Sequence, residues 1–349
     1  MKSSLQGRWP SSKQPLPPSD LQIGELLQLN LSSIPKGSGP VSRGQHPKHH
    51  GCAEALFQVL PSIPPELRVG IFHEACTYRA LVRFSNGRQQ DDRKADAHGM
   101  AIKVLGVLGP KLLEGLEHET AQDFVLVDSE TFFTGDPFEY ALVSRATMGK
   151  GVSRLWAGLL LLLRPCLLIR IARFIAKRPL SPLEANYFST VPFSFGARAV
   201  TYVALSQDVS DASDQFGPDG LSRALARTLK SRAVTFDFCI DLHGDDTRHP
   251  IEDPTQSWSK AGAERIKLAS LILVQQEVHP NAPVAENLQF SPWHCLPAHE
   301  PIGFINRARK PIYREMARAR HLRCGVQPVE STEDLPAYRK GPGSAGDTP

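Results

Sequence analysis

The run Tyr78-Arg79-Ala80-Leu81-Val82-Arg83-Phe84-Ser85, closed by Asn86-Gly87, carries the pattern that decides the fold. Successive side chains of a strand point to opposite faces, so Arg83 and Ser85 share one face and their apolar neighbours share the other. Five more runs are short, apolar or alternating, and are broken by Pro and Gly, which is typical of strands. They are 56–60, 101–108, 124–128, 199–205 and 233–242. We therefore predict one antiparallel sheet or barrel within an α+β domain.

Three stretches have helical patterns, namely 151–177, 261–268 and 311–324. The body that holds these strands and helices, 40–329, has no linker that would divide it. We predict a single domain there, with a helical insertion at about 151–178. The flanking stretches 1–39 and 330–349 are rich in Pro, Gly and Ser, and their low apolar content predicts flexible tails.

The charge balance and the cysteines exclude several classes of protein. The 40 basic residues exceed the 36 acidic ones by only 4, so we expect no nucleic-acid partner, which would need a larger surplus to neutralise phosphates. The six cysteines are scattered and form no C-x-x-C pair, which argues against a zinc site and a disulfide framework. The N-terminus has no apolar segment typical of a signal peptide. We expect a cytoplasmic protein.

The most hydrophobic stretch, 155–178, is interrupted by Arg164, Pro165, Arg170 and Arg173. It lacks the run of about 20 apolar residues that a membrane-spanning helix needs. One interpretation is a basic amphipathic hairpin that makes peripheral membrane contact. The other is a pair of helices packed on the barrel or at a homodimer interface.

The loop Arg43-Gly44-Gln45-His46-Pro47-Lys48-His49-His50 stands just before a strand. A neutral imidazole can take a proton from a peroxide and return it to the leaving oxygen, because its ordinary pKa of about 6.5 suits both directions. We select His46 for this role. His49 and His50 compete with it, and the three histidines also fit a metal cluster or a structural role.

Arg83 shares its strand face with Ser85 and points opposite to its apolar neighbours. An arginine that faces inward needs a counter-charge. A haem propionate would supply one, because the planar guanidinium binds a carboxylate through two parallel hydrogen bonds, and Arg43 would serve a second propionate. The alternative is a salt bridge from Arg83 to an acidic residue in 91–96. Both interpretations stay open at this point.

Tyr313 is the candidate ligand of a ferric iron. A phenol, whose ordinary pKa is about 10, binds iron as phenolate only where the ionised form is stabilised, and Arg309 lies one helical turn earlier. Pro311 between them indicates that the helix begins or bends there. The alternative is a tyrosine that packs its ring under a helix.

Taken in order, these residues resemble the catalase family, and in particular its short, single-barrel members. The resemblance spans roughly 40–325. Besides the segments quoted above, it includes His98-Gly99-Met100-Ala101-Ile102-Lys103, Gln122-Asp123-Phe124, Phe132-Phe133, Pro182-Leu183-Glu184, Tyr187-Phe188-Ser189, Phe290-Ser291-Pro292-Trp293 and Ile305-Asn306-Arg307-Ala308-Arg309.

The resemblance implies an eight-stranded antiparallel β-barrel with surrounding helices that binds haem b between the N-terminal strands and a proximal helix. It implies that His46 is the distal acid–base residue and that Ser85 is its hydrogen-bond partner. The implied haem-binding residues are Arg43 and Arg83 for the propionates, Phe132 or Phe133 for the pocket wall, Tyr313 as the iron ligand and Arg309 as its assistant.

Two positions depart from the family's pattern. Members that dismute hydrogen peroxide usually have a small apolar residue just before the distal histidine and an asparagine shortly before the Phe-Phe pair, whereas this chain has Gln45 and Asp128 there. An ionised Asp128 near the distal pocket would repel a peroxide anion and raise the pKa of His46. We therefore count Asp128 among the catalytic candidates and expect peroxidase chemistry rather than efficient dismutation.

Three functions follow as hypotheses. The first is a haem peroxidase or weak catalase that cleaves the O–O bond of hydrogen peroxide or an organic hydroperoxide and uses an organic electron donor. The second is an allene-oxide-synthase-like enzyme that transforms a lipid hydroperoxide at a membrane. The third is a haem carrier or sensor without turnover.

Overall fold

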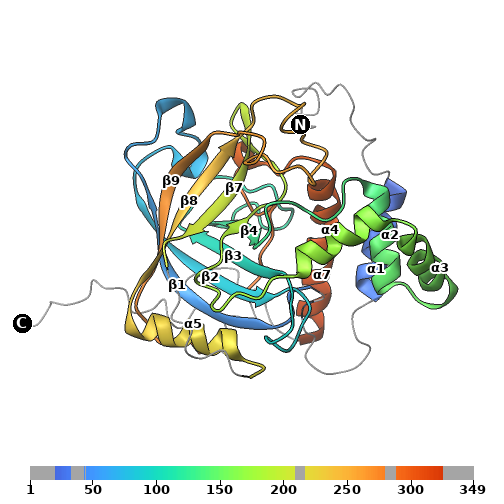
Figure 1. Cartoon of the computed structure of the whole chain (residues 1–349). Coiled ribbons are helices and arrows are strands. Elements are labelled where there is room, and N and C mark those ends of the chain that lie inside the picture. The colour runs from blue at the N-terminus through green and yellow to red at the C-terminus, as the bar shows by residue number, and fades with distance from the viewer. Residues whose placement is uncertain (1–19, 33–42, 44, 209–216, 280–287, 325–349) are drawn as a thin grey trace, which may run out of the picture.

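The structure is a computed structural model, and it describes residues 20–32, 43, 45–208, 217–279 and 288–324. A β-barrel forms one side of the molecule, and a group of helices stands against its outer wall (Figure 1). The tail predicted at 330–349 lies outside the described residues, as do the parts of 1–39 that precede and follow 20–32.

Nine antiparallel strands build the sheet, and eight of them close into a barrel, as predicted. The closed ring runs β1-β2-β3-β4-β5-β7-β8-β9 and back to β1, because β5 pairs with both β4 and β7. Strand β6 pairs with β7 outside this ring. The strands are β1 (His49–Val59), β2 (Thr77–Asn86), β3 (His98–Leu105), β4 (Ala121–Val127), β5 (Tyr187–Phe188), β6 (Phe193–Phe195), β7 (Arg198–Ser206), β8 (Val234–Leu242) and β9 (Arg265–Leu273).

The helix predicted at 261–268 is wrong, because this stretch leads into β9. Leu268, Leu271 and Leu273 are fully buried, and β9 forms antiparallel ladders with β1 on one side and β8 on the other. Ladder hydrogen bonds on both edges override the helix propensity of the Ala, Glu, Arg and Lys residues at its start.

Aromatic rings fill the interior of the barrel. Phe57, Phe124, Phe238 and Tyr202 are at most 3% exposed, and the ring centroids of Phe124 lie 4.9 Å from those of both Phe238 and Tyr202. Edge-to-face rings at this spacing pack tightly. The functional site therefore has to lie on the outer surface of the barrel wall.

Six α-helices lie outside the barrel in the described part of the chain. They are α1 (Asp20–Ser32), α2 (Pro137–Met148), α3 (Gly151–Leu162), α4 (Pro165–Ile175), α5 (Gly220–Ser231) and α7 (Phe304–Cys324), and three 3₁₀ turns lie at Pro65–Leu67, Gly70–Phe72 and Pro297–His299. Two helices therefore form within the predicted insertion at 151–178.

Helix α1 lies inside the predicted tail 1–39, so the tail assignment is wrong over 20–32. The reason is tertiary packing, since Leu26 is 1% exposed and belongs to a small apolar cluster with Ala141 of α2 and with Ala308 and Ile312 of α7. Burial of one apolar face stabilises a short helix that would be marginal alone.

Helix α7 begins at Phe304, seven residues before the predicted start at Pro311, and runs through that proline. A proline inside a helix removes one backbone hydrogen bond, yet the helix continues because Phe304, Ile305 and Ala308 are buried before it and Ile312 is buried after it. Residues on both sides of Pro311 consequently belong to one helix.

Candidate active site

A cavity of ≈ 250 Å³ lies outside the barrel wall. Residues of β2, β3 and β4 form one side of it, and α7 contributes a large part of its lining. The lining residues are Asn30, Arg43, Gln45, His46, Arg83, Ser85, Gly99, Met100, Ala101, Val125, Leu126, Val127, Phe132, Phe133, Tyr140, Phe174, Ser189, Gln289, Phe290, Arg309, Ile312, Tyr313, Met316, Ala317 and Arg320. All the predicted site residues except Asp128 are among them.

The alternation of β2 explains how the barrel presents polar groups to this cavity. Val82 and Phe84 belong to the hydrophobic core, whereas Arg83 and Ser85 line the cavity, as the sequence pattern predicts. Asp91 pairs with Arg93 and Asp92 with Lys48. The carboxylate of Asp96 accepts the backbone N–H groups of Arg88 and Gln89. Each acidic residue of the stretch that offered an alternative partner for Arg83 thus has another partner.

His46 is held in place by its backbone and by one ring nitrogen. Its N–H donates to the carbonyl of Gly87 at 3.0 Å, Arg83 Nη2 donates to its carbonyl at 3.1 Å, and its Nδ1 lies 3.1 Å from Ser85 Oγ. Its φ of 54° is in the left-handed region, which is uncommon for a residue other than glycine. These contacts fix the ring and leave Nε2 out of the Ser85 hydrogen bond.

Gly99 of β3 provides the space for this ring. A Cβ at position 99 would lie 2.7 Å from His46 Nδ1 and 3.0 Å from Ser85 Oγ, which is closer than non-bonded atoms approach. The strand must therefore carry glycine where it passes beneath the His46–Ser85 pair.

The surroundings of His46 favour the neutral imidazole. Burial in the protein and, after it, the positive charge of Arg83 lower the pKa of His46 to about 4, while Asp96 and Asp128 act in the opposite direction with smaller effect. Asp128 does raise the pKa of His46, as expected. The sum of all effects nevertheless lowers it, because burial and Arg83 outweigh Asp128. His46 is a free base at neutral pH.

Asp128 faces away from the cavity. Its carboxylate accepts the backbone N–H of His98 at 2.9 Å and lies 2.8 Å from His98 Nδ1, and Lys177 donates to its carbonyl. The preceding residue, Val127, lines the cavity in its place. Neighbouring residues of an extended chain face opposite sides. The distal wall of the cavity therefore has the isopropyl group of Val127, where the carboxylate of Asp128 was predicted.

Arg309 and Tyr313 both line the cavity from α7, and residues four apart share a helix face. The guanidinium of Arg309 stands over the ring of Phe132, with Cζ 5.7 Å from the ring centroid. Among the described residues its buried Nη1 has no hydrogen-bond partner. A buried guanidinium nitrogen without a partner indicates that an acceptor is still to be supplied.

Arg320 was not predicted, although it follows Tyr313 by seven residues, which is two helical turns on the same face. It is 8% exposed and donates from Nη2 to the carbonyl of Leu288 at 3.3 Å. Arg43 Nη2 donates to the same carbonyl at 2.6 Å. Two arginines from opposite ends of the chain thus meet at one end of the cavity.

The cavity is strongly basic, and aromatic and aliphatic side chains form much of the rest of its wall. Four arginines line it, and its described lining residues include no carboxylate. Phe132 and Phe133 form part of its wall with ring centroids 4.3 Å apart, and Phe174 of α4 packs against Phe133 at 5.1 Å. Such a lining suits a large, flat, apolar ligand that carries anionic groups.

Asn30 of α1 also lines the cavity and was missed, because its helix was expected to be a flexible tail. The competing histidines are not among the lining residues: His50 is 1% exposed on β1, where burial holds its pKa well below the ordinary value. In the described ranges no group of three His, Cys, Asp or Glu side chains could hold a metal ion. The metal-cluster interpretation of the three histidines is therefore wrong.

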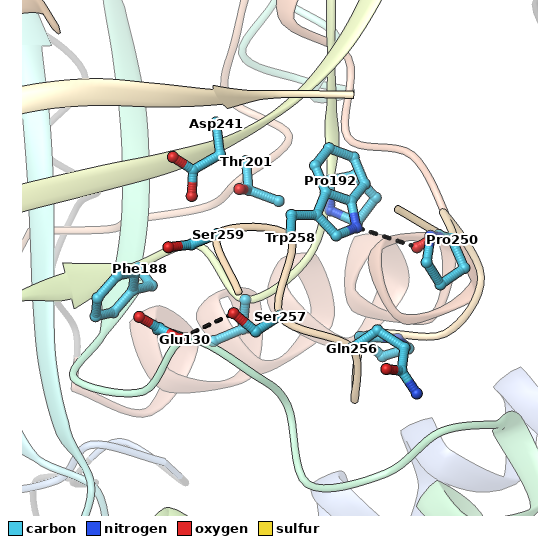
Figure 2. Close-up of a pocket in the computed structure, with 12 residues that line it drawn as sticks. Glu130, Phe188, Pro192, Thr201, Asp241, Pro250, Gln256, Ser257, Trp258 and Ser259 are labelled. Atoms are coloured by element: carbon cyan, nitrogen blue, oxygen red, sulfur yellow. Dashed lines mark hydrogen bonds between the residues drawn. The ribbon is translucent and has the colours of Figure 1, made fainter. Parts of the chain in front are cut away.

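A second pocket lies at the end of β7 and β8 (Figure 2). Glu130 accepts a hydrogen bond from Ser257 Oγ at 2.9 Å, and Trp258 Nε1 donates to the carbonyl of Pro250 at 3.4 Å. Its volume of ≈ 20 Å³ suffices for about one water molecule. It carries no candidate chemistry.

No protein-family model matches the chain, and no curated protein matches it. Solved structures do match over nearly its whole length. A fungal catalase superposes with a TM-score of 0.63 at 20% identity, covering 96% of this chain and 70% of its own. The chain has the catalase fold. A bacterial catalase (TM-score 0.62, 17% identity, 92% and 65% covered) and catalase A from Saccharomyces cerevisiae (0.62, 18%, 96% and 72%) agree with this.

The residues that this catalase fold brings to its cavity fit haem b. The macrocycle needs apolar walls, its two propionates need cationic partners and its iron needs an axial ligand. Phe132 and Phe133, the four arginines and Tyr313 answer these needs, and the buried Nη1 of Arg309 still requires an acceptor close to Tyr313.

Proposed function

We propose that the protein is a haem-b-dependent oxidoreductase that cleaves the O–O bond of hydrogen peroxide or of an organic hydroperoxide, and that it works as a peroxidase with an organic electron donor. The observation that carries the proposal is the convergence of two pairs on one basic, carboxylate-free cavity among the described residues. These pairs are His46 with Ser85 and Tyr313 with Arg309.

When bound, haem b supplies a ferric iron that binds and polarises the peroxide. The Tyr313 oxygen is the proposed iron ligand, and Arg309 lies one helical turn before it on the same face of α7. Arg43, Arg83 and Arg320 would pair with the two propionates. Phe132 and Phe133 would shield the macrocycle from water.

The proton steps belong to His46. As a free base it takes a proton from the peroxide, and as the resulting imidazolium it returns the proton to the leaving oxygen. The Ser85 hydroxyl, 3.1 Å from Nδ1, fixes the orientation of the ring, so that the other nitrogen is available for the transfer. The positive charge of the neighbouring Arg83 destabilises the imidazolium form of His46 and so favours release of the proton.

The test is peroxide consumption by the protein reconstituted with haem b, with and without a phenolic donor, across pH. Because the pKa of His46 is lowered to about 4, the free base persists on acidification, and the rate should stay level down to about pH 5 and fall through pH 4. Circular dichroism at each pH separates this fall from unfolding. A fall centred near the ordinary imidazole pKa of about 6.5, or no consumption at any pH, contradicts the proposal.

Val127→Asn should raise the dismutation of hydrogen peroxide by about tenfold, because it adds an amide hydrogen-bond donor to the distal wall. Oxygen evolution measures the gain. Asp128→Asn is the matched control: it adds the same amide one residue later, where the side chain faces His98, and it should give no gain. A gain only from Asp128→Asn would show that Asp128 and not Val127 faces the substrate. Equal gains from both variants would contradict the assignment of Val127 alone to the distal wall.

A second candidate function is the transformation of a lipid hydroperoxide. Phe174 of α4 favours it, since this residue lines the cavity from a helix whose outer face is apolar. Loss of a fatty-acid hydroperoxide, compared with loss of hydrogen peroxide under the same conditions, separates the two. A protein that binds haem b and consumes neither would be the carrier or sensor.

A further inference from the structure

Helix α3 has its apolar residues on the outside. Val152, Leu155, Trp156 and Leu159 of α3, with Leu163 just after its end, follow one another at helical spacing and are 52–79% exposed. A core-packed helix turns such a stripe inward. The residue that α3 buries is Ala157, at 3% exposure. The expectation that this hairpin packs on the barrel is therefore wrong for α3, which stands at the far side of the helical group from the barrel (Figure 1).

The same segment carries positive charge only. Between Gly151 and Arg178 there are six basic residues and no acidic one. Arg170 is paired with Glu139 of α2 at 2.6 Å, and Arg164 reaches the same carboxylate at 4.0 Å. Lys177 donates to the carbonyl of Asp128. Five of the six basic residues are nevertheless exposed, namely Arg154, Arg164, Arg173, Lys177 and Arg178. Exposed cations beside an exposed apolar stripe match the chemistry of an anionic lipid surface.

The shape of the hairpin excludes a simple transmembrane helix. No single helix in the described ranges is long and apolar enough to cross a bilayer, and α3 and α4, which qualify only as a pair, are bent by 98° at the break between them. Twelve residues of α3 extend over about 18 Å, well short of the ~30 Å hydrocarbon core. This geometry suits a helix that lies in the interface with its apolar face inserted.

We propose that the α3–α4 hairpin is a docking surface for a membrane that contains anionic phospholipid. The apolar stripe of α3 enters the headgroup–acyl boundary, and the basic residues bind the phosphates. The proposal does not depend on turnover, so it stands or falls separately from the proposed function.

A third cavity lies beside this surface and shares part of its wall with the active-site cavity. It has a volume of ≈ 1030 Å³ and lies beside α4, where Arg173, Lys177 and Arg178 contribute to its lining. It shares Phe132 and Phe174 with the active-site cavity. A docked membrane would therefore lie beside the wall of the active site.

The experiment is cosedimentation of the full-length, haem-loaded protein with vesicles. We expect binding to phosphatidylcholine vesicles that contain phosphatidylserine, weaker binding to pure phosphatidylcholine, and less binding at high salt, because salt screens exposed charges. Emission from Trp156 should shift to shorter wavelength on binding, and Trp156→Phe should remove that shift.

The double variant Leu155→Glu, Leu159→Glu should reduce the bound fraction by roughly tenfold. Both side chains are exposed, so the fold is preserved. Leu108→Glu is the matched control, because Leu108 is as exposed as Leu155, at 79%, but lies outside the hairpin; it should bind as the wild type does. No sedimentation with anionic vesicles at low salt overturns the proposal. The proposal is also overturned if the protein forms a dimer in solution, the double substitution dissociates that dimer, and vesicles bind neither the wild type nor the double variant.

Discussion

Tyr313→Phe should abolish the charge-transfer absorption of a ferric phenolate and lower both haem affinity and peroxide consumption by at least about 10²-fold, because it removes only the oxygen that would bind iron. The phenyl ring remains, so the packing of α7 is kept. Haem titration followed by optical spectroscopy measures the affinity and the absorption band in one experiment.

Tyr140→Phe is the control for this substitution. Tyr140 is the second phenol that lines the cavity, and burial raises its pKa, which keeps it protonated and a poor ligand. The variant should retain the band and the activity. If the band survives in Tyr313→Phe and disappears in Tyr140→Phe, the ligand assignment is wrong.

His46→Asn should lower peroxide consumption by about 10²–10⁴-fold, the usual contribution of a positioned acid–base group, while the spectrum of the haem-loaded protein stays that of the wild type. Asparagine is chosen because it tolerates the left-handed backbone at φ 54° and cannot act as a base at neutral pH. Stopped-flow mixing with hydrogen peroxide gives the rate.

His49→Asn provides the comparison, because His49 belongs to the same histidine run but does not line the cavity. Its rate should stay within a few-fold of the wild type. Equal losses in the two variants would mean that the cluster as a whole, rather than His46, supports the reaction.

Much of this site could be predicted because it rests on local rules. The alternation of β2 places Arg83 and Ser85 on one face in any extended backbone, and the spacing of Arg309 and Tyr313 places them on one helix face. This periodicity does not depend on tertiary contacts, so both pairs can be predicted from the sequence alone.

The errors arise where tertiary contacts decide. The position shortly before the Phe-Phe pair predicts Asp128 in the distal pocket, but a shift of one residue exchanges the faces of an extended segment, so Val127 and not Asp128 lines the cavity. Helix α1 and Asn30 were missed because Leu26 becomes apolar core only when α7 lies against it. Strand β9 was read as a helix because its pairing with β1 and β8 is non-local.

Arg320 shows a different kind of error. Its position two turns after Tyr313 was readable from the sequence, but an arginine among several others at the end of a basic helix has the pattern of a solvated face. Only its contact with the Leu288 carbonyl, shared with Arg43, distinguishes it from its neighbours.

The ring-filled barrel has a consequence for how this protein can diverge. Along β2 the residues that hold the fold together alternate with those that line the cavity, and the two sets face different environments. A substitution at an outward position changes the lining of the cavity and leaves the aromatic interior untouched. Natural selection can therefore alter what the cavity binds through every second residue of a strand, at little risk to the ability of the chain to fold.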